Sequence, residues 1–305
     1  MIIREDLPLA RTFYFVANRV FLFFAVDIAI TIGYVVYRQE WLSIPQLPLG
    51  LAGAALTVFL AFRIKAAYDR WWEARTLWGG LVNWSRTLAR RCQVFLNPAS
   101  GGEDEAAMDD FQQRMTYLQI AYVHALRSHL RQHDCFSELP RWLNEDEIEA
   151  LRLHENVPMG IQLLMGGLAK GAFRRGWLDA FRLISIEDAL AEITNVQGAC
   201  ERIKNTPFPR QFDHFPKMFT NVFCLFIPIG LVASLGLLTP IASSLIGFML
   251  LSLESFGRQL ESPFENTIND IPMSALSRMI EINLKQGLGE RRLPEALKPI
   301  EGFLF

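Results

Sequence analysis

The sequence is poor in the residues that build disulfide scaffolds, metal centres and nucleic-acid surfaces. It has four cysteines and five histidines in 305 residues. No two cysteines form a C-x-x-C pair, which argues against a zinc ribbon or a disulfide framework. The 30 Lys and Arg residues against 32 Asp and Glu residues give a net charge of −2, whereas a protein that binds phosphate backbones needs a basic excess. Nucleic acid is therefore not an expected partner.

Sequence motifs of catalysis and cofactor binding are also missing. There is no G-x-S-x-G, P-loop or G-x-G-x-x-G sequence, and the glycines within 166–171 lack the Lys-Ser/Thr pair of a phosphate cradle. His124, His129 and His133 lie near Cys135, and the last two histidines share a helix face that zinc could use. No H-E-x-x-H pattern or second ligand pair accompanies them. We therefore expect a polar surface helix here, and no enzyme, cofactor or metal site.

Long stretches of the chain lack charge altogether. Met218 to Leu253 contains no Asp, Glu, Lys or Arg. A single helix over this run would be about 54 Å long, against a hydrocarbon core of roughly 30 Å. The run must turn back, and Thr239-Pro240 is the expected corner because proline breaks a helix interior. Two membrane spans are therefore predicted, at about 218–238 and 241–256.

Two further apolar runs, at about 20–37 and 47–62, predict the first two spans. A composition of 51% apolar and 20% charged residues fits a membrane protein with a large region in water. The N-terminus has charges of both signs and no cleavable signal-peptide pattern, so the first span is expected to be kept. Cations flank the spans on one side, at Arg4, Arg11, Arg19, Arg63, Lys65, Arg70, Lys217 and Arg258. The opposite turns carry only Arg38, so the positive-inside rule places both termini and 65–216 in the cytoplasm.

The cytoplasmic part has the pattern of helices. Apolar side chains recur at three- and four-residue intervals from Phe111 to Leu126, which is typical of an amphipathic helix, and no run alternates like a strand. Solvated breaks are expected at 97–105 and 137–140. We therefore predict an all-α membrane protein. Its parts are an N-terminal segment with two spans (1–64), a cytosolic helical region (65–216), two further spans (217–258) and a cytosolic C-terminal segment (259–305) that is irregular after Gly287.

The segment from Ala61 to Arg91 follows the second apolar run and contains almost no helix-breaking residues. We therefore expect one helix to leave the membrane here and continue into the cytoplasm. Cations and indoles cluster in this segment, and both favour the membrane–water boundary; the tryptophans are Trp71, Trp72, Trp78 and Trp84. Within it, A-Y-D-R-W-W-E-A-R-x-L-W-G at 67–79 resembles the bestrophin family, and most closely its bacterial members. E-R-I-K-N-T-P-F-P at 201–209, and E-S-P-F with N-D-I-P at 261–272, match the family in the same order. The first motif supplies the family residues Arg70, Trp71, Trp72, Glu73 and Arg75.

This resemblance implies an ion channel. Members of the family assemble as homopentamers with one pore on the axis. The resemblance also implies a multi-pass protein of the bacterial inner membrane, surrounded by lipid. Such a protein conducts small inorganic monovalent ions. Chloride and other anions are favoured on family grounds, and no cofactor is implied. Apolar pore rings carry no charge sign, so a pore selective for monovalent cations such as sodium is an alternative. A non-conducting membrane scaffold or receptor, whose cytosolic helices bind a partner, is the alternative from a different class.

Ala54, Val58 and Phe62 are spaced four residues apart and share one face of the second span. On spacing alone, ordinary helix packing explains such a stripe. The resemblance instead assigns it to the pore neck, because in bestrophins three apolar side chains at this spacing form the neck. The last of them lies eight residues before the arginine of the Arg-Trp-Trp motif, here Arg70. Apolar rings can gate ions by drying out, although Ala54 is smaller than the residue typical of the family.

The resemblance also implies a second constriction at the cytosolic exit of the pore. In the family it is a ring of one apolar residue, on a helix before the Glu-Arg-Ile-x-Asn-Thr-Pro motif. Ile193 is the best match in this sequence, and Leu190 is the next.

Acidic side chains offer two more candidate sites. Animal bestrophins bind calcium through an acidic run after a Pro-Phe, but here only Glu265 and Asp270 are acidic in that segment. Calcium takes six to eight oxygen ligands, so we expect a helix-capping turn and no calcium site. Asp27 lies inside the first span, where a carboxylate is costly. It is either a functional group or a structural one, which pairs with a neighbouring helix or lies near the membrane boundary as a charge at a helix N-terminus.

Overall fold

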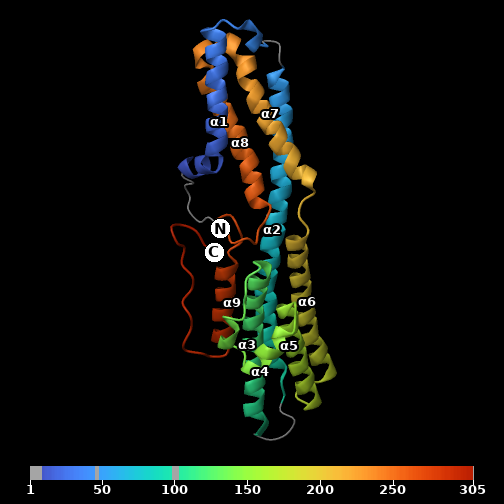
Figure 1. The fold of residues 1–305 in the computed structure, drawn as a ribbon. Helices are drawn as coiled ribbons and strands as arrows, with labels where there is room; N and C mark the ends of the chain where they lie inside the picture. The colour runs from blue at the N-terminus through green and yellow to red at the C-terminus, as the bar shows by residue number, and fades with distance from the viewer. Residues whose placement is uncertain (1–8, 45–47, 98–102, 305) are drawn as a thin grey trace. The chain divides into compact units, whose positions relative to one another are not determined.

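The structure, a computed structural model, describes residues 9–44, 48–97 and 103–304, and it is built from helices (Figure 1). The α-helices are α1 (Leu9–Val35), α2 (Leu49–Phe95), α3 (Glu103–Leu130), α4 (Glu145–Arg152), α5 (Val157–Arg174), α6 (Ala180–Asn205), α7 (Arg210–Leu235), α8 (Thr239–Leu260) and α9 (Met273–Gly287). Short 3₁₀ turns are η1 (Glu40–Leu42), η2 (Leu139–Arg141) and η3 (Gly236–Leu238). In the described ranges the extended pairing is limited to one isolated bridge between Ile300 and Phe303. The predicted all-α fold class is confirmed. The predicted features of residues 1–8 and 98–102 lie outside the described residues.

The chain divides into two compact units. The first, the apolar unit, comprises 4–71 and 207–262, and so contains α1, the first part of α2, α7 and α8. The second, the polar unit, comprises 72–206 and 263–305, with the rest of α2, α3 to α6 and α9. Each unit takes its residues from separate parts of the sequence, so long-range packing creates both.

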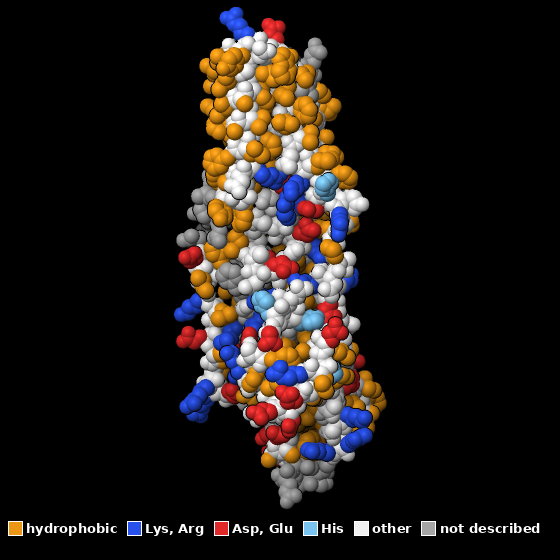
Figure 2. Space-filling model, viewed as in Figure 1, with side chains coloured by type: hydrophobic (Ala, Val, Ile, Leu, Met, Phe, Trp, Pro, Cys, Tyr) orange, Lys and Arg blue, Asp and Glu red, His pale blue; other side chains and the backbone are white. Residues whose placement is uncertain are grey.

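Three helical stretches of the described residues are long and apolar enough to cross a membrane: Phe13–Val35, Leu49–Phe95 and Arg210–Leu260. Figure 2 shows hydrophobic side chains over most of the apolar unit, which carries its visible charged side chains near its ends, whereas Lys, Arg, Asp and Glu side chains are scattered over the polar unit. Within the apolar unit α8 packs against both α1 and α7. An apolar surface of this kind suits a lipid environment.

The turn between α7 and α8 lies a few residues before the predicted corner. Helix α7 ends at Leu235, and the chain turns through Gly236 to Leu238. Gly236 has φ +52°, a conformation that glycine adopts without steric cost. Pro240 is not the corner but part of the first turn of α8, where the missing N–H would have had no helical partner anyway.

The polar unit is organised around α3. The apolar stripe predicted from Phe111 to Leu126 is buried along its whole length, so the predicted amphipathic helix is confirmed. Helix α3 packs against α5 and α9, with a smaller contact to α6. The tail beyond α9 is irregular, as predicted, apart from the Ile300–Phe303 bridge.

Candidate functional site

The exposed face of α2 carries the three residues predicted to form a pore neck. Val58 and Phe62 are 56% and 70% exposed, and Ala54 is exposed as well. Another face of the same helix buries Leu56 and Leu60 in the core of the apolar unit. The stripe is therefore not part of the core that this chain's own helices form. Its side chains are open to lipid, to another subunit or to a pore.

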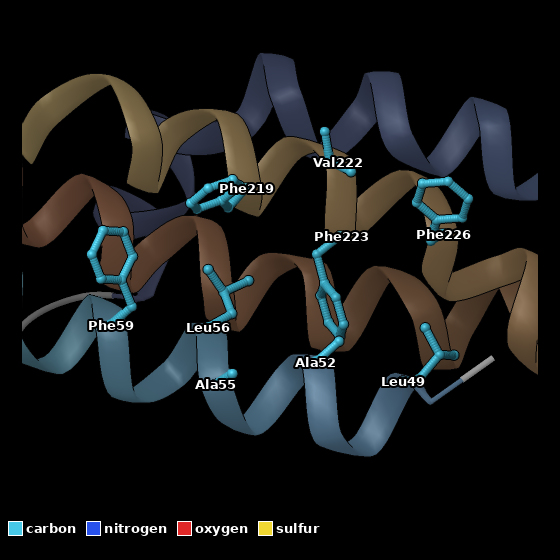
Figure 3. Close-up of a pocket in the computed structure, with 9 residues that line it drawn as sticks. All are labelled: Leu49, Ala52, Ala55, Leu56, Phe59, Phe219, Val222, Phe223 and Phe226. Carbon is cyan, nitrogen blue, oxygen red and sulfur yellow. The ribbon is translucent and has the colours of Figure 1, made fainter. Parts of the chain in front are cut away.

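An apolar groove lies between α2 and α7 (Figure 3). It has a volume of about 390 Å³ and is lined by Leu49, Ala52, Ala55, Leu56, Phe59, Phe219, Val222, Phe223 and Phe226. Figure 3 shows Phe223 reaching from α7 towards α2. A Cβ atom on Gly53 would lie 3.0 Å from Cζ of Phe223. The absence of a side chain at Gly53 therefore lets the two helices approach closely.

The first two family motifs meet through side-chain contacts in the structure. In the apolar unit the Arg70 guanidinium lies 5.3 Å from the ring centroid of Phe208, a cation–π arrangement. In the polar unit Arg202 donates a 2.6 Å hydrogen bond to Glu73. Residues about 130 positions apart are thereby paired, which gives these motif residues a structural role.

The other residues of the first motif differ in their surroundings. Trp71 stacks on Tyr68 with ring centroids 6.2 Å apart, Trp72 is exposed, and Arg75 is half-buried. Trp78 is fully buried in the polar unit. The prediction that Trp78 marks the membrane–water boundary is therefore wrong, because a core indole cannot lie in a lipid headgroup layer.

The segment after the third motif is a closed turn. Glu265 accepts a 2.7 Å hydrogen bond from Lys204 of the second motif. The buried Asp270 carboxylate accepts hydrogen bonds from the backbone N–H of Thr267 at 3.0 Å and from its hydroxyl. Both acidic groups thus bind groups of this chain, in the manner of a capping turn.

Ile193 is fully buried, at 0% exposed, and Leu190 is buried beside it on α6. A side chain that lines an aperture must reach the solvent, so neither buried side chain is placed to form the exit ring that the resemblance implies. Phe181 and Ile184, near the start of the same helix, are 87% and 57% exposed. The resemblance assigns the constriction to Ile193, whereas the large exposed apolar side chains of α6 lie nearer its N-terminus. No local sequence pattern distinguishes the exposed from the buried apolar residues of this helix.

His124 and His129 lie near different carboxylates and do not converge on one site. His124 is buried on α3, with Nδ1 3.4 Å from Glu138 and Nε2 3.4 Å from Glu281, and its ring stacks on Trp142. The prediction of a surface helix is therefore wrong at His124. His129 lies 3.4 Å from Glu201 instead. Across the described ranges no three His, Cys, Asp or Glu side chains are placed to hold a metal ion.

Asp27 is buried between α1 and α8. Its Oδ2 accepts hydrogen bonds from the hydroxyl of Ser243 at 2.6 Å and from that of Ser244 at 3.1 Å. Asp27 therefore pairs with a neighbouring helix, which is one of the alternatives given for it above.

Arg63 is the residue whose role the sequence did not reveal. As one of several cations after an apolar run, Arg63 is expected from the sequence to be a charge at the membrane boundary. In the structure it is 3% exposed and donates hydrogen bonds to groups of α7 and α8 and to Glu261 beyond them. These partners are more than 140 positions away in the sequence, so no local sequence pattern indicates that Arg63 is buried and hydrogen-bonded.

Comparison with known proteins gives one consistent result. Residues 10–286 match the family model described as bacterial/fungal bestrophin protein. The chain is 34% identical to the voltage-dependent anion channel-forming protein mll4386 of Mesorhizobium japonicum, over 85% of this chain and 79% of the relative. It is 32% identical to YneE of Escherichia coli, which carries the same description, over 93% and 90% of the two chains.

Solved structures agree with the sequence relatives. A crystal structure of a bacterial bestrophin homologue from Klebsiella pneumoniae matches with a TM-score of 0.83 and 30% identity, covering 91% of this chain and all of that one. With the family model spanning most of the sequence, this match confirms the resemblance drawn from the motifs: the chain belongs to the bacterial and fungal bestrophin family.

Proposed function

We propose that the protein is an anion channel whose pore is lined by α2. The observation that carries the proposal is the exposed stripe of Ala54, Val58 and Phe62, on a helix long and apolar enough to cross a membrane. Rings of such side chains gate ions because a narrow apolar passage dries out. Membership of the bestrophin family points to an ion channel and not to an enzyme. The relatives described as anion channel-forming support anions over cations.

The proposed assembly is a homopentamer with one pore on its axis. One chain offers too few membrane-spanning helices to enclose an obvious pore, whereas copies of α2 around an axis would stack the stripe into three rings. The stripe and the α2–α7 groove are apolar and open in the single chain, as expected of surfaces that meet lipid or another subunit. Native mass spectrometry of the detergent-solubilised protein tests this: a pentamer supports the assembly, and a monomer contradicts it.

The proposed topology has four spans, formed by α1, the first part of α2, α7 and α8, in the bacterial inner membrane. Both termini and the polar unit would be cytoplasmic. The support comes from the cations that flank these helices on one side, together with the tight turn that reverses the chain at Gly236.

The cytosolic exit ring is assigned to Phe181 in place of Ile193. Phe181 lies one position after the first residue of α6 and is the more exposed of the two large apolar side chains that are exposed there, Phe181 and Ile184. A large aromatic ring contributed by each copy would make a second apolar constriction. No calcium site is part of the proposal, because Glu265 and Asp270 already accept hydrogen bonds from their own chain.

Reversal potentials of the purified protein in planar bilayers with a potassium chloride gradient test the channel and its selectivity together. An anion channel shifts the reversal potential towards the chloride equilibrium potential. A shift towards the potassium potential would instead support the cation-selective alternative. A correctly assembled protein that carries no current would support the membrane scaffold or receptor.

A further inference from the structure

Arg63 follows Phe62 directly on α2, and the two side chains have opposite environments. Phe62 is 70% exposed and Arg63 is 3% exposed. Consecutive residues of an α-helix point about 100° apart around its axis. The anchoring of Arg63 inside the apolar unit therefore determines the direction in which Phe62 points.

The guanidinium of Arg63 binds three segments at once. Its Nε donates to the carbonyl of Phe212 at 2.8 Å, and its Nη1 donates to the carbonyl of Glu254 at 3.0 Å. Its Nη2 donates to the carboxylate of Asp213 at 2.8 Å and lies 3.4 Å from that of Glu261. Contacts with all of these oxygen atoms require a planar group whose N–H donors point in several fixed directions. A guanidinium has this geometry, and a lysine ammonium does not.

Two features of the neighbouring helices are matched to this side chain. Pro216 lies inside α7 and has no N–H, so it cannot donate to the carbonyl of Phe212 four residues earlier. Arg63 supplies the missing donor. On α8, a Cβ atom at Gly257 would lie 3.2 Å from Nη1 of Arg63 and 3.3 Å from Ile64. A larger residue there would push α8 away from the guanidinium.

We propose that Arg63 is the positioning residue of the pore neck. By tying α2 to the start of α7 and to α8, it fixes the rotation of α2 about its own axis and keeps Phe62 directed at the pore. The inference rests on the proposed function, because it gives Phe62 a place in the neck.

The chain offers a matched control in Arg258, a second cation of the same cluster. Arg258 pairs with Glu254 and lies 3.9 Å from Asp213, two residues that Arg63 also binds. It is 42% exposed, and its ion pairs within the described residues are with α7 and α8 only. Arg258→Gln therefore disturbs the cluster without releasing α2.

The first experiment measures the orientation of α2 through the reaction of Phe62→Cys with a charged, water-soluble thiol reagent. The four native cysteines are buried and give a low background. Adding Arg63→Lys is expected to slow the reaction by about threefold or more, whereas adding Arg258→Gln changes it by less than about twofold, because only the first releases the helix. Equal rates with both additions would overturn the proposal.

The second experiment compares single-channel conductance in lipid bilayers for Arg63→Lys, Phe62→Ala and the double variant. Arg63→Lys is expected to change conductance by about threefold in the native background and to have no further effect on Phe62→Ala, since residues that act through one another are not additive. Additive changes would overturn the proposal. If Phe62→Ala alone leaves conductance unchanged, the neck itself is wrong, and the positioning role falls with it.

A second variant covers the case in which Arg63→Lys does not assemble. Asp213→Asn combined with Glu261→Gln keeps the arginine and removes both of its carboxylate partners. Both residues also line an open cavity of about 710 Å³, so the substitutions need no repacking of a closed core. The same loss of Phe62→Cys reactivity and the same non-additivity are expected, and their absence would overturn the proposal.

Discussion

At the scale of single residues, Val58 and Phe62 are distinguished by their exposure on a helix that buries Leu60 on another face. Val58→Ala and Phe62→Ala should raise single-channel conductance, because a wider ring is easier to wet. Ala54→Phe should lower it by narrowing the proposed ring at that position.

Leu60, which is 1% exposed, is the control. Leu60→Ala should cost about 2–5 kcal/mol of stability. A similar loss of stability in the Val58 and Phe62 variants, with unchanged conductance, would show that the stripe is packed and that the neck is misplaced.

Ile193 and Phe181 form a second pair on one helix with opposite environments. Ile193→Ala should lower the free energy of unfolding by about 2–5 kcal/mol, because it leaves a cavity in the polar unit. Phe181→Ala should leave the melting temperature nearly unchanged and alter the relative permeability of anions of different size. Thermal melting and bi-ionic reversal potentials measure the two effects. Unchanged permeability in Phe181→Ala would exclude this residue from the exit ring.

Glu138 gives the polar unit a defined dependence on pH. A hydrogen bond from His124 and the charge of Arg127 lower the pKa of the Glu138 carboxyl to about 2, although burial alone would raise it. In the unfolded chain, the pKa of a glutamate carboxyl is about 4.3. The folded state therefore gains stability from this carboxylate above that pH, and loses the gain as the pH falls towards 2.

We accordingly expect Glu138→Gln to destabilise the protein by about 1–2 kcal/mol at neutral pH, a value discounted for partial exposure of the pair. The difference from the unmodified protein should shrink as the pH falls from about 4 towards 2, where the folded-state carboxylate takes up its proton. Denaturant unfolding at several pH values measures it. A difference that grows as the pH falls would contradict the assigned ion pair.

At the scale of helices, the contact between α2 and α7 depends on a glycine. Gly53→Val would drive its side chain into the Phe223 ring and separate the helices, at a cost of about 1–3 kcal/mol. A Cβ atom at Gly50, one turn earlier, would meet no neighbouring heavy atom of the described residues within 4 Å, so Gly50→Val should change stability by about 0.5 kcal/mol or less. Melting temperatures in the same detergent compare the two, and equal losses would argue against close packing at Gly53.

At the scale of the whole molecule, the proposed four-span topology would place the two ends of each apolar helix on opposite sides of the membrane, and labelling in cells can distinguish them. Glu40→Cys and Leu238→Cys should react with an impermeant thiol reagent added outside the cell, whereas Glu105→Cys and Arg291→Cys should react only after lysis. The native cysteines are buried and should react slowly. External labelling at Glu105→Cys would rule out the four-span topology.

The sequence alone determined the features that depend on local composition and periodicity. Charge-free runs gave the apolar helices, because charged residues are costly in lipid, and the spacing from Phe111 to Leu126 gave the amphipathic α3. The ordered motifs around Arg70 and Glu201 were enough to identify the family. Spacing also located the stripe at Val58 and Phe62, since residues four apart share a helix face in any context.

Only the tertiary structure decided which apolar or charged side chains are buried. Ile193 and Phe181 are both apolar residues of α6, and packing against other helices places one in the core and the other in solvent. Arg63 resembles the neighbouring boundary cations in sequence, but its partners on α7 and α8 are more than 140 positions away. The turn at Gly236 likewise came before Pro240, because proline is tolerated in the first turn of a helix. Burial and long-range pairing depend on the whole chain, so no local pattern contains them.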